Sequence, residues 1–240
     1  MFLFNTKCRY KIYREIYLST NSRQSLKTQT ASLIQQKHKT YPKVYKYLFT
    51  YISNMLLNKN TFKVLAEFCS DYSKKIYGGQ IAKKLKMNQK TVSNVLNALE
   101  KQNIIKYSTE GKNKYYFLNR LNPKILDILK ILELGRKNNF LDKYPKLSEL
   151  FIALEKRTSE MLIIFGSYAN FTANDKSDLD VFVLGKIGEI EDLEKKYNLN
   201  INIIKSSKEK FNKEEVFIKE VIKNHIVLKG VEEFIELTWQ

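Results

Sequence analysis

The clearest hydrophobic pattern in the chain starts near residue 61 and predicts three short helices followed by a β-hairpin. Gly78 and Gly79 are expected to break the chain before a second helix over 80–85, and Asn88 is expected to cap the third helix. Apolar segments at 104–107 and 115–118 predict two strands joined around Gly111. Apolar residues at helical spacing mark the buried faces of the first and third helices: Phe62, Val64, Leu65 and Phe68, then Val92, Val95, Leu96 and Leu99.

The second half of the chain alternates amphipathic helices with apolar strands. A helix is predicted from Pro123 to about Gly135, followed by a polar loop over 136–144 and a helix over 146–156. Strands are expected at 161–165, 179–184 and 199–205, and helices at 187–197, 214–224 and 231–237. This order predicts a small mixed sheet with helices on one face. His225, near the end of a predicted helix, is interpreted as structural.

The first 54 residues show no sustained periodicity, and the only helix predicted nearby covers 41–57. Residues 1–54 hold ten Lys or Arg and one acid, so they carry +9 of the formal charge of +17. Two interpretations stay open. The segment is a basic arm that follows a phosphate backbone, or it is translated upstream sequence without stable structure and Met55 is the true start.

Composition restricts the class of protein. An apolar content of 43% is ordinary for a globular chain, and no apolar run reaches the length of a membrane span. The two cysteines, Cys8 and Cys69, have no metal-type spacing and indicate no disulfide framework. We therefore expect a cytoplasmic protein that does not associate with membranes. The basic excess favours a nucleic-acid partner.

The most specific chemistry lies in Gly166-Ser167, followed about ten residues later by Ser177-Asp178-Leu179-Asp180. Side chains two apart on a strand point to the same face, so Asp178 and Asp180 can bind one divalent cation together. Gly166 and Ser167 stand at a predicted helix start, where backbone N–H groups can receive a phosphate. Metal beside phosphate is the basic requirement of nucleotidyl transfer.

These residues resemble the Gly-Ser…Ser-Asp-x-Asp motif of minimal nucleotidyltransferases in the DNA polymerase beta-like superfamily. The resemblance implies Mg²⁺ at Asp178 and Asp180, both catalytic, and ATP or another NTP at Gly166, Ser167 and Ser177. It also implies a third carboxylate on the next strand, where this chain has Asn202, which cannot act as a general base. A second departure is Phe171, expected either beside the phosphates or against the core.

The first half resembles the winged helix-turn-helix of MarR- and ArsR-like regulators, whose third helix enters the DNA major groove. The resemblance implies that the side chains of the third helix contact the edges of the DNA bases. These candidate residues are Gln89, Lys90, Ser93, Asn94 and Asn97. Lys83, Lys84, Lys112 and Lys114 would attract phosphates. The same polar faces would also suit a winged helix that binds proteins, and that alternative stays open.

The expected fold is therefore α+β: a winged helix (three helices plus a β-hairpin) and a small nucleotidyltransferase domain with a mixed sheet and helices. The expected divisions are a basic extension over 1–54, the winged helix over 55–120, a helical linker over 121–145 and the transferase-like domain over 146–240. The linker helix either bridges the domains or pairs with a second copy to form a homodimer.

Two functions remain. One is a Mg²⁺-dependent nucleotidyltransferase, adenylylating a protein partner such as a HEPN-type toxin, as related antitoxins do, with a winged helix on double-stranded DNA. The other is a transcription regulator whose transferase-like domain binds nucleotide or a partner without catalysis. The missing third acid favours the second function, and the intact Ser-Asp-x-Asp favours the first. An RNA-modifying transferase is the weakest alternative.

Overall fold

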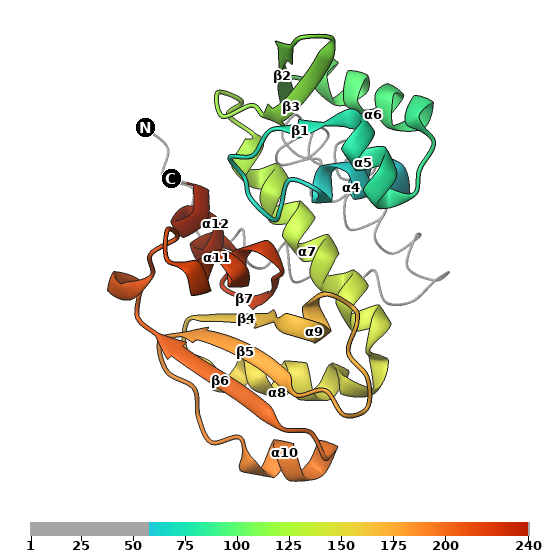
Figure 1. Ribbon diagram of the computed structural model, residues 1–240. Coiled ribbons are helices and arrows are strands. Elements are labelled where there is room, and N and C mark those ends of the chain that lie inside the picture. Colours follow the sequence, from blue (N-terminus) through green and yellow to red (C-terminus); the bar gives the residue numbers. More distant parts are fainter. Residues whose placement is uncertain (1–57, 240) are drawn as a thin grey trace, which may run out of the picture. The chain divides into compact units, whose positions relative to one another are not determined.

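A computed structural model describes residues 58–239 (Figure 1), and Asn58–Gln240 form one unit by their contacts. The basic segment 1–54 and the helix predicted over 41–57 lie outside the described residues. The described chain is α+β, as predicted.

The first part is a winged helix whose elements follow the predicted order. Asn88 caps the third helix as expected, because its side-chain oxygen accepts a hydrogen bond from the Lys90 backbone N–H at 2.8 Å. The hairpin strands are longer than predicted and pair antiparallel over six residues each. The elements are α4 (Lys59–Ala66), β1 (Ile76–Tyr77), α5 (Gly78–Leu85), α6 (Gln89–Lys101), β2 (Ile105–Glu110) and β3 (Asn113–Leu118).

Gly78 and Gly79 do not break the chain before α5; they form its first turn. The Gln80 side chain accepts a hydrogen bond from the Tyr77 backbone N–H at 3.4 Å, which supports a helix start at Gly78. The short strand β1, absent from the expectations, pairs with β3 and completes a sheet of order β1-β3-β2.

The helix α7 (Ile125–Lys143) is the largest departure from the predicted elements, because it runs through Gly135 and includes most of the predicted loop. Gly135 allows α4 close to α7, since an added Cβ would lie 2.5 Å from the Phe62 ring. Beyond Gly135 the polar residues have buried partners. Arg136 binds Glu133, and the Lys137 ammonium donates to the Leu228 carbonyl at 2.6 Å. These partners stabilise the helical conformation where local sequence indicated a loop.

The second part contains a four-stranded mixed sheet of order β6-β5-β4-β7. The pair β4–β5 is antiparallel, β5–β6 is parallel, and β4–β7 is antiparallel. The strands β4 and β5 match the predicted bounds, whereas β7 was not predicted. The strands are β4 (Met161–Phe165), β5 (Leu179–Leu184), β6 (Ile201–Ser206) and β7 (Ile226–Lys229).

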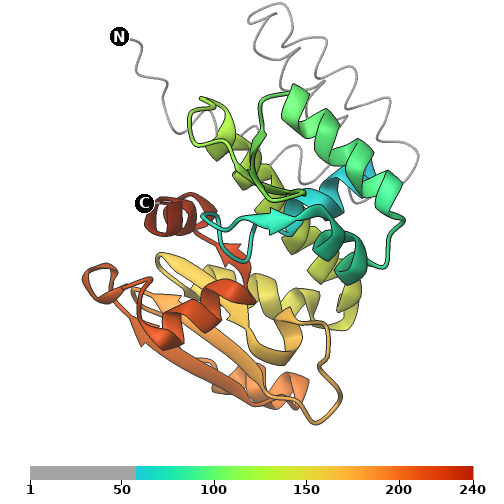
Figure 2. The same cartoon turned by 45° about the horizontal axis from the view of Figure 1, so that its top comes forward.

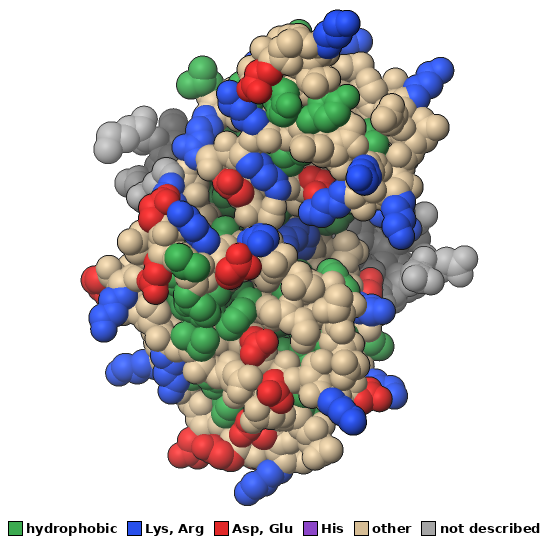
Figure 3. All heavy atoms as spheres, viewed as in Figure 1, with side chains coloured by type: hydrophobic (Ala, Val, Ile, Leu, Met, Phe, Trp, Pro, Cys, Tyr) green, Lys and Arg blue, Asp and Glu red, His purple; other side chains and the backbone are tan. Residues whose placement is uncertain are grey.

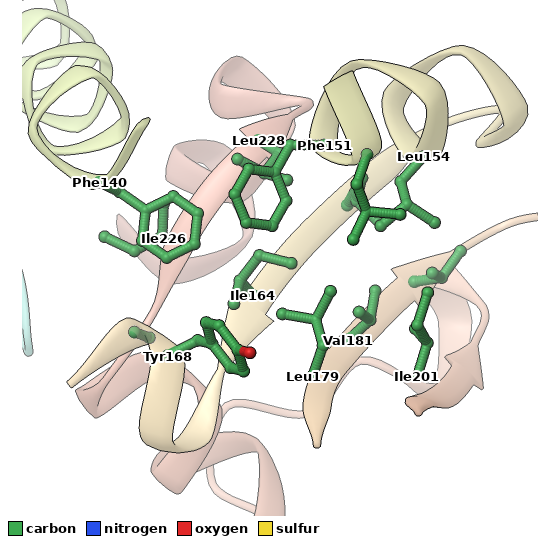
Figure 4. Packing of buried hydrophobic residues seen from close by; sticks show 14 of the residues in the cluster. Phe140, Phe151, Leu154, Ile164, Tyr168, Leu179, Val181, Ile201, Ile226 and Leu228 are labelled. Atoms are coloured by element: carbon green, nitrogen blue, oxygen red, sulfur yellow. The ribbon is translucent and has the colours of Figure 1, made fainter. Parts of the chain in front are cut away.

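Helices cover both faces of this sheet, so the expectation of one covered face was wrong. On one face, Phe151 and Leu154 pack with Leu179 and Val181 of β5 (Figure 4). On the other face, the Phe182 ring packs against Phe217 of α11, which lies across the sheet in Figure 2. The remaining elements are η1 (Pro145–Leu147), α8 (Ser148–Arg157), α9 (Gly166–Ala169), α10 (Glu191–Tyr197), η2 (Lys208–Lys210), α11 (Val216–Lys223) and α12 (Val231–Trp239).

Candidate functional site

Strand β4 ends at Phe165, and the chain turns at Gly166 into the single turn of α9. Gly166 has φ +68°, a conformation that disfavours any residue with a Cβ. A Cβ there would lie 2.3 Å from Asp180 Oδ2. Glycine is thus required twice at this turn, for its backbone conformation and for the space that the Asp180 carboxylate occupies.

The two motif aspartates flank Leu179, which is fully buried in the core. Because side chains alternate along an extended chain, Asp178 and Asp180 lie on the opposite side from Leu179. Asp180 is half-buried and pairs across the sheet with Phe165, directly before Gly166. Asp178 precedes the strand and is exposed. The fold therefore brings the Gly-Ser turn and the Asp-x-Asp strand together, as the motif predicted.

Ser177 shapes the loop that leads into β5. Its hydroxyl oxygen accepts a hydrogen bond from the Asn174 backbone N–H at 3.0 Å, and its own N–H donates to the Asn174 carbonyl at 3.0 Å. These bonds close a turn over 174–177 and place Asp178 at the start of the strand. The nucleotide-binding role expected for Ser177 stays a prediction.

Asn202 lies beside Asp180, because the parallel register of β5 and β6 makes the two residues partners. The Asn202 amide Nδ2 donates to Asp180 Oδ1 at 3.1 Å. The Asn202 amide oxygen in turn accepts from Asn200 Nδ2 at 3.2 Å. The residue at the expected third-carboxylate position is therefore an amide, hydrogen bonded to one of the two acids.

Phe171 packs against aromatic side chains of the core. Its ring is parallel to that of Tyr144, with centroids 6.4 Å apart, and lies 6.3 Å from Phe140. Tyr168, buried in α9, contacts the same Tyr144 ring at 5.1 Å. Of the two expected positions for Phe171, these contacts match the one toward the core, at its edge, because the side chain is 44% exposed.

The donor set fits one divalent cation of the hard, oxygen-preferring kind. Asp178 and Asp180 supply carboxylate oxygens, and Gly166 places no side chain against Asp180 Oδ2. Between residues 58 and 239, no three His, Cys, Asp or Glu side chains gather as a further metal-binding group. A cation held here would draw its remaining ligands from water, from substrate oxygens or from uncharged protein oxygens.

The predicted DNA readers share the open face of α6. All five of them, Gln89, Lys90, Ser93, Asn94 and Asn97, are exposed, as are Lys112 and Lys114 of the hairpin. A hollow of about 240 Å³ joins helix and hairpin, with Gln89, Ser93 and Lys114 among its lining residues. The Lys114 ammonium also lies 4.2 Å from the Tyr107 ring centroid. Helix and hairpin thus form one continuous polar surface.

Charge divides sharply between the two parts of the described chain. Residues 58–124 contain fourteen Lys or Arg and four acids, net +10, whereas residues 144–239 contain fourteen Lys or Arg and seventeen acids, net −3. Figure 3 accordingly shows mostly basic side chains over the winged helix, and acidic and basic side chains mixed over the lower part. Lys84, one of the expected phosphate contacts, forms an ion pair with Glu67 at 2.8 Å. Within residues 58–239, the net positive charge thus lies on the winged helix.

His225 belongs to a buried polar network and lies on the loop between α11 and β7. Its Nε2 is 2.8 Å from Arg136 Nη1 and 3.1 Å from Glu133 Oε2. The Tyr72 hydroxyl donates to Glu133 Oε1 at 2.9 Å. Burial lowers the pKa of His225, against the opposing effect of Glu133. Sequence reasoning missed this network, because its members lie far apart in the chain; an Arg three residues after a Glu was the only local signal.

None of the helices between residues 58 and 239 is both long and apolar enough to span a lipid bilayer.

Comparison with protein families gives two matches. Residues 144–236 match the nucleotidyltransferase domain, which covers the sheet and the Gly166–Asp180 region. Residues 75–107 match the bacterial regulatory protein, arsR family, which covers α5, α6 and the start of the hairpin. No curated protein and no solved structure matches the chain.

Proposed function

From a chain that combines an ArsR-family helix-turn-helix domain with a nucleotidyltransferase domain, we propose a DNA-binding regulator whose second domain binds a nucleoside triphosphate together with Mg²⁺. The hydrogen bond from Asn202 to Asp180 carries this choice of binding over turnover. Asn202 stands at the position where an acidic residue would complete the catalytic site of a transferase.

The nucleotide-binding part of the proposal rests on the Gly166 turn and the two aspartates. Gly166 has no side chain between its backbone and Asp180 Oδ2, so a cation bound at this carboxylate could also contact a phosphate at the turn. Bound Mg²⁺ would neutralise phosphate charge at this point. In this proposal Asp178 and Asp180 orient the bound group, and Ser167, in the first turn of α9, receives a phosphate oxygen.

Turnover requires a base for the acceptor hydroxyl, and the site offers none at the expected position. An amide does not take up a proton at neutral pH. The Asn202 oxygen also accepts a hydrogen bond from Asn200, which directs it away from Asp180. An NTP bound here would persist as a ligand, and its presence would be sensed by the DNA-binding part.

The DNA-binding part of the proposal rests on the exposed polar face of α6 and on the net charge of +10 over residues 58–124. Amide and hydroxyl side chains there can contact base edges, while lysines of the hairpin contact phosphates. Binding should weaken steeply as salt rises, because each neutralised phosphate releases counterions.

The proposal is tested on the full chain with two matched double variants. Asp178→Ala with Asp180→Ala should abolish Mg²⁺-dependent ATP binding, measured by calorimetry, and leave DNA binding without ATP intact. Lys90→Ala with Asn94→Ala should abolish binding to DNA upstream of the gene, measured by fluorescence anisotropy, and leave ATP binding intact. ATP should change the DNA affinity of the natural chain. ATP binding by the aspartate double variant equal to that of the natural chain would reject the nucleotide site.

A second candidate is nucleotidyl transfer to a protein, and the retained Asp-x-Asp pair beside Gly166 favours it. The acceptor would be a partner such as a HEPN-type toxin, with ATP as the donor. Incubation with labelled NTPs, Mg²⁺ and the product of the neighbouring gene tests it: label on that protein, absent with Asp178→Ala, would establish transfer.

A homodimer also remains a proposal, and α7 offers it little support. Ile128, Leu129 and Leu132 of this helix are buried within the described chain. These contacts favour the interpretation of α7 as a bridge between the two parts. Sedimentation equilibrium would measure the oligomeric state directly.

A further inference from the structure

We infer that Asn202, held by Asn200, is a positioning residue that keeps Asp180 turned toward the Gly166 turn and prevents the site from binding a divalent cation without a nucleotide. The inference rests on the proposed nucleotide site and specifies how that site is regulated.

The two oxygens of Asp180 have different surroundings. Oδ1 accepts the hydrogen bond from Asn202 Nδ2 at 3.1 Å, while Oδ2 faces Gly166, where even a methyl carbon would lie within 2.3 Å. One oxygen is therefore held by β6, and the other is presented at the turn. Oδ2 can bind a cation without disturbing that hydrogen bond, whereas a cation on Oδ1 would compete with the Asn202 N–H for the same oxygen.

The orientation of the Asn202 amide follows from its neighbours. A carboxylate accepts hydrogen bonds and donates none, so the amide must turn its N–H toward Asp180. Its oxygen is then directed at Asn200, whose N–H completes the chain of hydrogen bonds at 3.2 Å. The only Asn202 atom that could bind a cation is thus oriented away from Asp180. Turning the Asn202 oxygen toward Asp180 would break the hydrogen bonds with Asp180 and Asn200 and would place the amide oxygen against a carboxylate oxygen.

The consequence concerns when the cation binds. The protein offers the exposed carboxylate of Asp178 and one oxygen of Asp180, a small donor set for an ion that prefers six oxygens. Phosphate oxygens of an NTP would supply further donors at the Gly166 turn. Cation and nucleotide should therefore bind together, so that the domain responds to the Mg²⁺–nucleotide complex and not to Mg²⁺ alone.

Mn²⁺ provides the probe, because free Mn²⁺ is counted directly by electron paramagnetic resonance. The natural chain should bind Mn²⁺ weakly alone and more tightly by about tenfold or more with ATP, since added oxygen ligands raise affinity. Asn202→Asp adds a carboxylate beside Asp180 and should raise Mn²⁺ affinity without ATP by about tenfold, because ligand charge sets cation affinity. It should also lower the melting temperature without metal and restore it with Mn²⁺.

Asn202→Ala should instead lower Mn²⁺ affinity in the presence of ATP several-fold, roughly the cost of one hydrogen bond that orients Asp180. Asn200→Ala should act in the same direction with a smaller effect. Ile204→Ala, two residues farther along β6 and on the same face, is the matched control and should leave Mn²⁺ binding unchanged.

The outcomes separate this inference from the proposed function. Unchanged Mn²⁺ affinity without ATP in Asn202→Asp, in a chain that folds normally, would overturn the inference even if ATP binds. A natural chain that never binds ATP would reject the proposed function, while a gain of Mn²⁺ binding in Asn202→Asp would still support the arrangement of Asp180 and Asn202. Equal losses of Mn²⁺ binding in Asn202→Ala and Ile204→Ala would indicate general damage to β6 and would also overturn the inference.

Discussion

Replacing Glu133 by glutamine should destabilise the whole described chain, because this buried carboxylate joins three segments. It accepts from the Tyr72 hydroxyl, which follows α4, and from Arg136 Nη1 at 2.9 Å on its own helix. His225, from the loop after α11, lies within 3.1 Å. Glu133→Gln keeps the shape and removes the charge, leaving the Arg136 guanidinium, 17% exposed, without a counter-charge.

The size of the effect follows from the pKa of Glu133. Burial alone would raise this pKa, but the Arg136 charge and His225 lower it from 4.5 to about 2. A difference of that size favours the ionised form by roughly 3 kcal/mol. Removing one partner of a buried ion pair typically costs about 3–5 kcal/mol, because the other charge remains buried. We expect a loss of about 3 kcal/mol in the free energy of unfolding, a large share of a total of about 5–15 kcal/mol.

Urea denaturation followed by circular dichroism measures this loss, with the slope checked for a single transition. Glu220→Gln is the matched control: it makes the same change in an exposed ion pair with the same three-residue spacing on one helix, 3.2 Å from Lys223, whose contribution is typically below about 1 kcal/mol. Glu133→Gln with Arg136→Met should recover part of the stability, because it removes the unpaired charge as well. A loss below about 1 kcal/mol in Glu133→Gln, equal to that of the control, would refute the reasoning.

Three further predictions concern the turn, the buried histidine and the cap. Gly166→Ala should lower the affinity for ATP with Mn²⁺ by about tenfold or more. A residue with a Cβ in the left-handed conformation costs about 1–2 kcal/mol, and this Cβ would also displace the Asp180 carboxylate. Calorimetry measures the affinity, and an unchanged value would contradict the steric argument. Burial lowers the pKa of His225 below 6.5, so the unfolded chain takes up the proton more readily than the folded one. The contribution of His225 to the free energy of unfolding is therefore complete above pH 6.5 and is lost as the pH falls below that value. The free energy of unfolding should therefore fall from pH 7 to pH 5 with a smaller slope in His225→Gln, and equal slopes would exclude this origin. Asn88→Ala should cost about 1 kcal/mol of stability by urea denaturation, through the lost bond to the Lys90 N–H.

Local patterning was sufficient for the elements whose residues alternate or repeat cleanly. Strands β4 and β5 have the predicted bounds, because their apolar runs end at turn-forming residues. It failed where partners are distant in sequence. The predicted loop after Gly135 is helical, since Arg136 and Lys137 meet Glu133 and the Leu228 carbonyl inside the fold. Strand β7 is only four residues long and directly follows a helix, so its pattern was too short to separate from that helix.

The site was predictable in its composition and unpredictable in its internal bonding. The resemblance to the transferase motif predicted Gly166 near Asp180, and in the structure strand, turn and strand form one antiparallel pair with Phe165 opposite Asp180. The same reasoning placed Asn202 on the adjacent strand, but it could not orient an amide that ligates through oxygen and donates through nitrogen. The orientation of the Asn202 amide depends on Asn200, two residues earlier in the chain, which donates to its oxygen. It also depends on the parallel register, which makes Asp180 the partner of Asn202. One substitution from acid to amide therefore has two effects: it removes a base, and it adds a donor that fixes the remaining acid. The second effect supports the proposal that such a site keeps the shape of a nucleotidyltransferase and binds nucleotide without turnover.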